Sequence, residues 1–251
     1  MRTLQQPLFT PETEWVPPDR LPDLSSYKEI AIDLETRDPS LTTMGSGAVR
    51  REGEVVGIAI AVEGWSGYFP IAHEGGGNMD RYLVLDWFEE VLHTTSTKIF
   101  HNAMYDVSWI RSLGFQINGG IVDTMVAASL CNENRYSYTL DSVAKEYVGM
   151  GKNEKLLQEA AKDWGINPKA ERGRLPAPFV GEYAEKDAEI TLKLWGAMQH
   201  EISKQDLWDV FNLETNLFPC LVDMKFKGVR VDVESCSSQD TTNGNRRRAA
   251  A

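Results

Sequence analysis

The fold is decided by residues 29–35, EIAIDLE, in which an apolar run with β-branched residues ends on two acids. Residues 29–33 have the composition of a buried strand. Because side chains alternate between the two faces of a strand, Asp33 and Glu35 share one face and Leu34 points into the core behind them. Neighbouring carboxylates repel each other, and a hard cation such as Mg²⁺ or Mn²⁺ between them removes that cost. For this motif alone, a strand end with two solvated acids is the alternative.

Apolar runs after this strand predict the rest of a sheet. Residues 55–63 and 67–71 form two further runs separated by a turn at 64–67, and with the first strand they are expected to form an antiparallel meander. Short strands are expected at 98–100 and 121–123. Each is followed by a helical pattern, so strands and helices alternate.

Helices are predicted where apolar residues recur at helical spacing between capping residues and glycines. The expected helices cover residues 81–93, 103–113, 124–130, 139–147, 154–164, 179–200 and 207–226. The second half of the chain is therefore expected to be mostly helical.

The chain has 251 residues, and its 42% of hydrophobic residues can bury a full core. The apolar run 55–62 is shorter than the ~20 residues that cross a bilayer, and residues 1–20 carry acids and prolines where a signal peptide is apolar. A cytoplasmic protein with no membrane partner is therefore expected. Cys131, Cys220 and Cys236 are widely spaced and imply neither a disulfide framework nor a zinc site.

The formal charge of −11 argues against a protein that coats duplex DNA, because that kind of binding needs many lysines and arginines. The same charge suits a metal-dependent nuclease. In such a site carboxylates hold divalent ions, and the ions present positive charge to the substrate phosphate.

Two further polar pairs have helical spacing. Asn102 and Asp106 are four residues apart at the start of a helix, and Tyr183 and Asp187 repeat that spacing, so each pair lies on one helix face. Each pair also has a purely structural alternative. Asn102 would be an N-cap and Asp106 a partner of the helix dipole, while Tyr183 would be a buried ring and Asp187 an ordinary surface acid. The ordered set of Asp-x-Glu, Asn-x₃-Asp and Tyr-x₃-Asp favours one shared functional site.

This ordered set resembles the DEDD exonuclease superfamily, in the subclass whose third motif carries a tyrosine. It is similar to the proofreading domain of family A DNA polymerases, particularly those of bacteriophages, over residues 27–200. Three stretches support the resemblance: YFPIAHE at 68–74, DTMVAA at 123–128 and YTLDSVA at 138–144.

The resemblance implies an α/β fold of the ribonuclease H-like type, a mixed five-stranded sheet with helices on both faces. Residues 27–203 are expected to form the exonuclease domain, and 204–234 a helix and strand similar to the start of a polymerase module. Residues 1–26, rich in proline and polar residues, are expected to form an extended arm, and the patternless residues 235–251 a disordered tail.

The resemblance also implies a metal-dependent 3′→5′ exonuclease that releases nucleoside 5′-monophosphates from the 3′ end of single-stranded or frayed DNA. Asp33, Glu35, Asp106 and Asp187 would hold two divalent ions, Mg²⁺ or Mn²⁺, which activate a water and stabilise the leaving oxygen. Tyr183 would stay protonated, since a tyrosine has an ordinary pKa of about 10, and would orient that water opposite Glu35.

Contacts to the terminal nucleotides are expected from stacking side chains and apolar wedges close to the motifs, because the last nucleotides must be held unpaired. The candidates are Thr36, Leu41, Asn102, Tyr105, Tyr136 and Phe179, with Asn102 resting on the resemblance. For Leu41, Tyr105, Tyr136 and Phe179 an ordinary core or surface residue is the alternative, and the sequence favours it at least equally. His73 and His101 lack a partner pattern and are expected to be structural.

Two alternatives stay open. An exoribonuclease like RNase D carries the same three motifs, and recognition of the 2′-hydroxyl depends on local contacts. A non-catalytic polymerase fragment that binds a nucleic-acid end is the other. Three roles are open for such an exonuclease, and the sequence does not rank them: action with a separate polymerase subunit, trimming of DNA with repair proteins, and degradation of leftover fragments. Loss of Asp33 and Glu35 together is expected to abolish cleavage, keep the fold and raise metal-free stability.

Overall fold

A computed structural model of the protein describes residues 12–151, 154–167 and 171–233. It contains one five-stranded sheet of order β3-β2-β1-β4-β5. Its strands are β1 (Glu29–Arg37), β2 (Glu54–Val62), β3 (Trp65–Pro70), β4 (Thr97–Phe100) and β5 (Ile121–Asp123). The first three strands are antiparallel neighbours, and β4 and β5 run parallel to β1. The mixed five-stranded sheet predicted from the sequence is confirmed.

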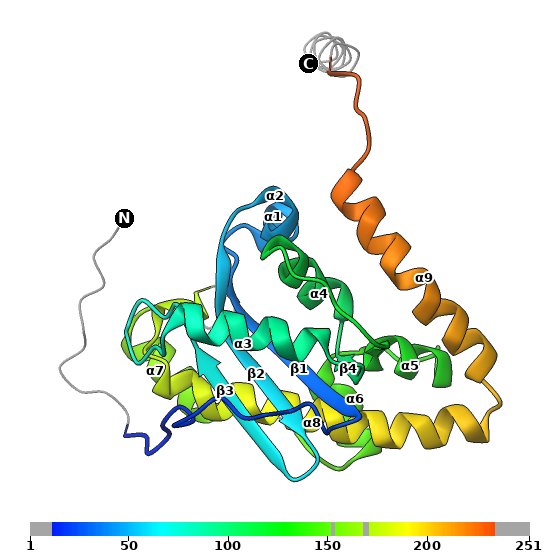
Figure 1. The fold of residues 1–251 in the computed structure, drawn as a ribbon, viewed down its shortest axis with the longest axis horizontal. Helices are drawn as coiled ribbons and strands as arrows, with labels where there is room; N and C mark the ends of the chain where they lie inside the picture. The colour runs from blue at the N-terminus through cyan, green and yellow to red at the C-terminus, as the bar shows by residue number, and fades with distance from the viewer. Residues whose placement is uncertain (1–11, 152–153, 168–170, 234–251) are drawn as a thin grey trace, which may run out of the picture.

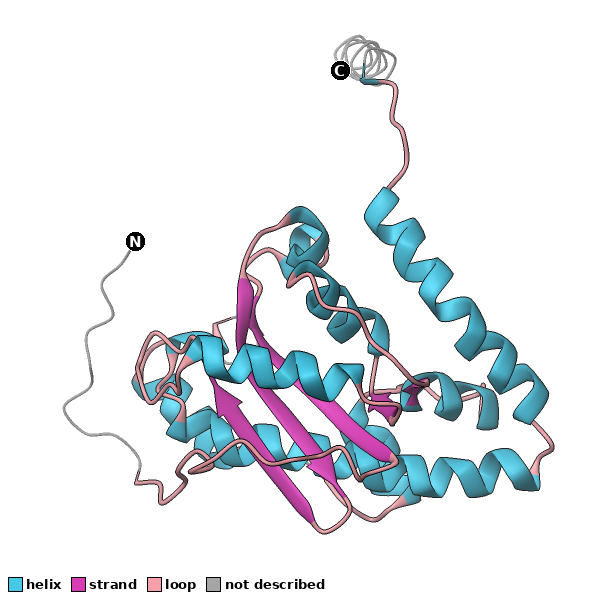
Figure 2. Cartoon of the chain, viewed as in Figure 1, coloured by secondary structure: helices cyan, strands magenta, loops and turns pink. Residues whose placement is uncertain are grey.

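Helices cover both faces of this sheet, as expected (Figure 1, Figure 2). They are α1 (Leu41–Met44), α2 (Gly47–Arg50), α3 (Arg81–His93), α4 (Ala103–Ser112), α5 (Thr124–Cys131), α6 (Leu140–Tyr147), α7 (Lys155–Asp163), α8 (Pro178–Lys204) and α9 (Trp208–Lys227). The expected helices agree with this assignment to within a few residues at each end. None of the helices that the structure describes has the length and apolar character needed to span a bilayer.

The two faces of the central strands differ in side-chain size. On one face Ile30, Ile32 and Leu34 pack with α3 and α4, while on the other Ala31 and Ala59 pack with α5 to α8. Small residues allow a helix to approach a sheet closely, because little side-chain volume separates the two. The long helix α8 therefore lies directly on β1 and β2.

Several short elements were not predicted. The turn between β2 and β3 is tighter than expected, and β3 begins at Trp65. Helices α1 and α2 and the 3₁₀-helix η1 (Arg172–Arg174) were missed because segments of three or four residues are too short to show periodicity. Residues 228–232, expected to include a strand, form none. The tail predicted at 235–251 lies outside the described residues.

The N-terminal arm, which is described from residue 12, has no regular secondary structure and packs on the body. The Trp15 indole donates to Glu185 Oε1 at 3.0 Å and lies so close to Gly181 that any side chain there would overlap it. Leu24 is buried with the α3 side of the core, and the Trp87 indole donates to the Pro22 carbonyl. The folded unit therefore starts earlier than the expected boundary near residue 27.

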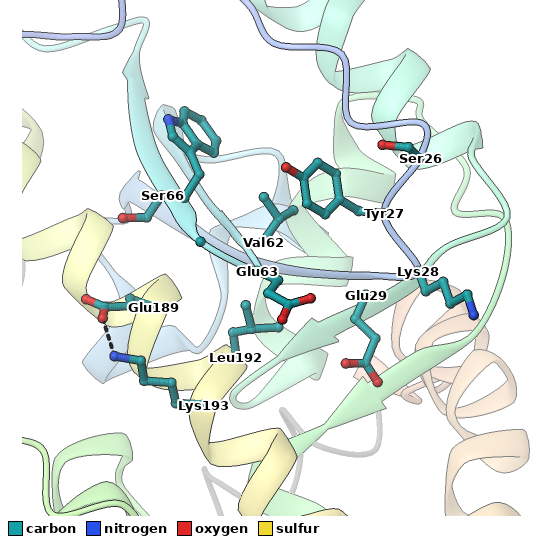
Figure 3. A pocket seen from close by; sticks show the side chains of 12 residues that line it. Ser26, Tyr27, Lys28, Glu29, Val62, Glu63, Ser66, Glu189, Leu192 and Lys193 are labelled. Carbon is teal, nitrogen blue, oxygen red and sulfur yellow. Dashed lines mark hydrogen bonds and ion pairs between the residues drawn. The ribbon is translucent and has the colours of Figure 1, made fainter.

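An open hollow of about 1100 Å³ lies where the β2–β3 hairpin, the start of β1 and α8 meet (Figure 3). Glu29 lines it at the opposite end of β1 from Glu35, and six residues of strand span roughly 20 Å. Its lining includes the ion pair between Lys193 and Glu189 and none of the acids of the three motifs. This hollow is separate from the candidate site.

Docking of the arm predicts a stability effect at Trp15. Trp15→Ala should lower the free energy of unfolding by roughly 2 kcal/mol, because the change removes a half-buried indole and its hydrogen bond. Denaturant unfolding followed by circular dichroism measures this. Val16→Ala, at an exposed neighbour, is the matched control and should change stability by less than about 0.5 kcal/mol. Equal effects of the two variants would show that the arm does not dock.

Candidate active site

The Asp-x-Glu pair lies near the end of β1, where the strand leaves its regular pairing. Asp33 pairs with Ala59 and Glu35 with Gly57, and the register shifts directly after Glu35. Leu34 lies in the α3 side of the core, as the alternation predicted. Glu35 is 2% exposed and Asp33 half-buried, so the two acids are not a solvated strand end.

Asp106 joins this pair from α4. Its Oδ1 accepts a hydrogen bond from the Leu34 backbone N–H at 2.9 Å, which ties the second motif directly to the first. Burial, and then the neighbouring Asp33 carboxylate, raise the pKa of Asp106 well above its ordinary value. The charged forms of Asp33 and Asp106 therefore oppose each other, and a cation between them would remove that opposition.

The start of α4 is held by Asp123 rather than by Asn102. The Asp123 carboxylate accepts from the backbone N–H groups of Asn102 and Ala103 at 2.9 and 2.8 Å, and from Met125 at 2.8 Å. Asn102 occupies the N-cap position with a left-handed backbone, φ 70°, and its side chain makes no capping bond. The expectation that the Asn102 side chain caps the helix was wrong.

Tyr183 and Asp187 follow each other by one turn on α8, and both are buried. Asp187 is 2% exposed, so the alternative of an ordinary surface acid does not hold. Burial is the main cause that raises the pKa of Tyr183 above its ordinary value; the Arg172 guanidinium opposes this shift, and the charge of Asp187 adds to it. Tyr183 is therefore a neutral hydroxyl donor at physiological pH.

Arg172, from η1, is a site residue that the motifs did not reveal. Its Nη1 donates to Glu35 Oε2 at 2.6 Å, and its guanidinium carbon lies 4.9 Å from the centre of the Tyr183 ring. Burial disfavours its charge, but the Glu35 carboxylate outweighs burial and raises the pKa of Arg172 above its ordinary value. It lies in a short irregular segment, so neither spacing nor periodicity could have identified it.

The residues present fit a divalent cation by their chemistry. Glu35 Oε1 is buried and accepts no hydrogen bond, which leaves it available as a ligand while Oε2 is held by Arg172. Within the described part of the chain, no three His, Cys, Asp or Glu side chains are already arranged so that they could hold a metal ion. The donors are all carboxylates, the ligand type that Mg²⁺ and Mn²⁺ prefer.

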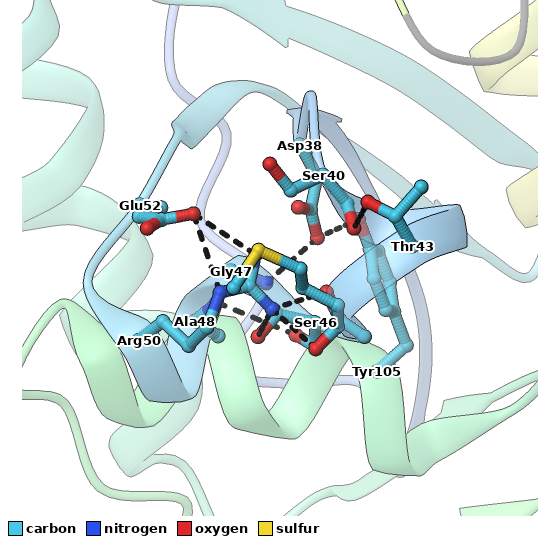
Figure 4. A network of polar contacts seen from close by, with 11 residues as sticks. Asp38, Ser40, Thr43, Ser46, Gly47, Ala48, Arg50, Glu52 and Tyr105 are labelled. Atoms are coloured by element: carbon cyan, nitrogen blue, oxygen red, sulfur yellow. Dashed lines mark hydrogen bonds and ion pairs between the residues drawn. The ribbon is translucent and has the colours of Figure 1, made fainter. Parts of the chain in front are cut away.

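Two of the candidates for substrate contact are joined beside this edge. The Tyr105 hydroxyl and Thr36 Oγ1 lie 2.6 Å apart, and the same hydroxyl donates to Asp38 Oδ2 at 3.3 Å. Asp38 also accepts from the Gly47 backbone N–H, which ties the loop that carries α1 and α2 to the end of β1 (Figure 4). Burial is the main cause that raises the pKa of Tyr105 to about 12.

The other candidates differ in exposure. Leu41 begins α1 and is 39% exposed, so an apolar side chain is available there, and Tyr136 is fully exposed. Phe179, in the first turn of α8, is 7% exposed within the core, so for this candidate the alternative of a core residue holds. The hydrophobic position 179 fitted a core residue equally well.

Both histidines have structural partners, as expected. His73 lies between the Tyr68 hydroxyl at 2.6 Å and the Leu175 carbonyl at 2.9 Å, and burial lowers its pKa to about 4. His101 contacts Thr124 Oγ1 and the Tyr138 carbonyl, each at 2.8 Å. His73 thereby holds the segment that follows Arg172.

Opposite stability effects are predicted for the two acids of β1. Asp33→Asn should raise the metal-free melting temperature, because it relieves the repulsion on Asp106. Glu35→Ala should lower the free energy of unfolding by about 3 kcal/mol, because it removes a buried side chain and leaves the partly buried Arg172 charge without its carboxylate. The gain in metal-free stability that was expected for removal of both acids is therefore predicted for Asp33 alone. Calorimetry in EDTA measures both, and stabilisation by Glu35→Ala would contradict the role given to the ion pair.

Known proteins are similar to this chain in sequence and in fold. A DNA-directed DNA polymerase of Pseudomonas phage M6 is 40% identical over 242 residues, which cover 93% of this chain and 36% of that protein. The structure of Brucella melitensis NrnC with bound Mg²⁺ has a TM-score of 0.59 at 18% identity and covers 84% of this chain and 92% of that one. Escherichia coli RNase D, an exoribonuclease involved in structured RNA processing, has a TM-score of 0.55 at 17% identity, over 87% of this chain and 50% of that one.

The fold is that of ribonuclease H-like exonucleases. This chain spans about a third of the length of the phage DNA polymerases that it matches. A family model described as 3′-5′ exonuclease, of the DNA polymerase A type, matches residues 18–203. The chain therefore belongs to the 3′-5′ exonuclease family of DNA polymerase A.

Proposed function

We propose that the protein is a metal-dependent 3′→5′ exonuclease that acts on the 3′ end of single-stranded or frayed DNA. The observation that carries this proposal is Glu35, a buried carboxylate with one oxygen held by Arg172 and the other accepting no hydrogen bond. Asp33 and Asp106 lie beside it and oppose each other's charge. A set of this kind is stable in its ionised form when divalent cations are bound.

Asp33, Glu35, Asp106 and Asp187 would hold two ions, Mg²⁺ or Mn²⁺. When bound, such ions supply a water acidic enough to attack phosphorus near neutral pH and stabilise the negative charge on the departing oxygen. The protein residues bind and orient the reactants. Their burial at the end of β1 and in α8 restricts their movement, which favours a fixed attack geometry.

Tyr183 would orient the attacking water by donating its hydroxyl proton in a hydrogen bond, and would not act as a base. Its raised pKa keeps the proton on the phenol oxygen at neutral pH. Glu35 lies within electrostatic reach of Tyr183 and would accept from the same water on the other side. The products would be a strand that is shorter by one nucleotide and ends in a 3′-hydroxyl, and a nucleoside 5′-monophosphate.

DNA is proposed as the substrate because the matching family model and the phage M6 relative are of the DNA polymerase type. The likeness to RNase D concerns the fold. Beside the acids, the hydroxyl groups of Thr36 and Tyr105 form a hydrogen bond with each other. Leu41 offers an apolar contact for an unpaired base. An exoribonuclease is the second candidate, favoured by the structural similarity to RNase D.

The test is digestion of a 5′-labelled single-stranded DNA, beside an RNA of the same sequence, with Mg²⁺, with Mn²⁺ and with EDTA. A ladder that shortens from the 3′ end only with metal, and faster for DNA, is the expected result. A faster RNA ladder would establish the exoribonuclease. No ladder with either metal, from a protein with a cooperative melting transition, would reject the catalytic proposal in favour of end binding.

Three variants are predicted to divide the roles in that assay. Asp187→Ala should lower the rate by at least about a thousandfold, because it removes a ligand of the ions. Tyr183→Phe should lower it by roughly ten- to a hundredfold, because the water loses one hydrogen bond and the ligands remain. Asp209→Asn, an exposed acid on α9, is the control and should leave the rate unchanged. Full activity of Asp187→Ala would place the site elsewhere.

A further inference from the structure

Arg172 contacts both Glu35 and Tyr183, the two residues proposed to orient the attacking water. One edge of its guanidinium donates to Glu35 Oε2 at 2.6 Å, and its carbon lies 4.9 Å from the centre of the Tyr183 ring. A guanidinium is planar, so it can donate along its edge while its face packs on an aromatic ring. One side chain therefore connects β1 to α8 at the site.

The segment that carries Arg172 is fixed from several sides. Gly173 packs so tightly on β2 that a Cβ there would lie 2.7 Å from Val56 Cγ1, and the Gly173 carbonyl accepts from the Glu74 backbone N–H at 2.8 Å. Two residues later, the Leu175 carbonyl contacts His73 Nδ1 at 2.9 Å. Arg172 thus projects from a backbone that is held in place.

Stability alone does not account for an ion pair at this position. Replacing a buried ion pair by apolar residues is often neutral or stabilising, because two charges lose their hydration when they are buried. The Arg172 side chain is 21% exposed and that of Glu35 only 3%, so the carboxylate bears most of this loss. The pair instead holds Glu35 with Oε2 occupied and Oε1 without a hydrogen bond.

We propose that Arg172 is a positioning residue that fixes Glu35 and Tyr183 relative to each other for attack on the terminal phosphodiester. This inference rests on the proposed exonuclease function. Arg172 acts through the two side chains that it contacts: the hydrogen bond selects which Glu35 oxygen is available, and the packing restricts the Tyr183 ring. Its contribution is therefore to the rate of the bound complex, with little effect on DNA affinity.

The first test is a double-mutant cycle between Arg172→Gln and Tyr183→Phe. Single-turnover rates are measured with saturating single-stranded DNA and Mg²⁺, and DNA affinity separately with Ca²⁺ by fluorescence anisotropy. Arg172→Gln should lower the rate by about a hundredfold and change the Kd for DNA by less than about threefold. The double variant should be no more than about threefold slower than the slower single variant, because both changes disturb one unit.

Two further variants separate positioning from charge and from folding. Arg172→Lys keeps a positive charge but cannot both donate in a fork and pack on the ring, so it should recover only part of the lost rate. Arg174→Gln, in the same short helix, removes a guanidinium that pairs with Glu171 and Glu74, and should leave the rate unchanged. Melting curves establish that each variant is folded, and Arg172→Lys provides the test if Arg172→Gln does not fold.

A second readout needs neither metal nor turnover. With 3-fluorotyrosine incorporated at position 183, the ¹⁹F resonance of the metal-free protein should shift in Arg172→Gln and stay in place in Arg174→Gln. An unmoved resonance, a rate within about threefold of wild type, or multiplicative losses in the double variant would each overturn the inference. If the wild-type protein itself does not degrade DNA with metal, the proposed function is rejected. If the wild-type protein is active and any of the three contradicting outcomes is found, only the role of Arg172 is rejected.

Discussion

The arrangement at the end of β1 depends on one electrostatic constraint, the compensation of carboxylates that have lost their hydration. Glu35 is compensated on one oxygen by the Arg172 guanidinium, and Asp106 accepts the backbone N–H of Leu34. Neither contact balances the opposition between Asp106 and Asp33, and burial, followed by this opposition, raises the pKa of Asp106. Burial without full compensation is costly for stability, and such costs are common where a protein binds an ion or a reactant.

The rest of the fold provides the geometry in which this constraint is met. Alanines on one face of β1 and β2 allow α8 to lie directly on the sheet, and isoleucines on the other face fill the space below α3 and α4. As a result Asp106 from α4 accepts from the backbone at the end of β1, and Tyr183 from α8 lies within electrostatic reach of Asp33 and Glu35, with Asp187 one turn further along α8. The close approach of α8 is therefore as necessary for the site as the acids themselves, since a larger residue at Ala31 or Ala59 would move the helix outward.

The sequence was sufficient for the five strands of the sheet and for the long helices, because each depends on a local pattern. Alternation at Leu34 and helical spacing at Tyr183 both carry over into the structure. Side-chain partners that come from distant segments were not predictable: Asp123 takes the capping role expected of Asn102, and Arg172 reaches Glu35 from 137 residues away. An apolar residue such as Phe179 fits a core and a binding surface equally well, so its burial could be known only from the structure.

Arg172 also bears on how the net charge of −11 should be interpreted. Although acids are in excess, one of the 26 basic residues, Arg172, pairs with the buried carboxylate of Glu35. A lysine would supply the same charge as a flexible point, whereas the planar guanidinium also restrains the Tyr183 ring. Charge compensation explains why a positively charged side chain lies beside Glu35. Only the packing on the Tyr183 ring explains why an arginine is better suited to this position than a lysine. The residue is thus best understood through the two side chains that it holds together.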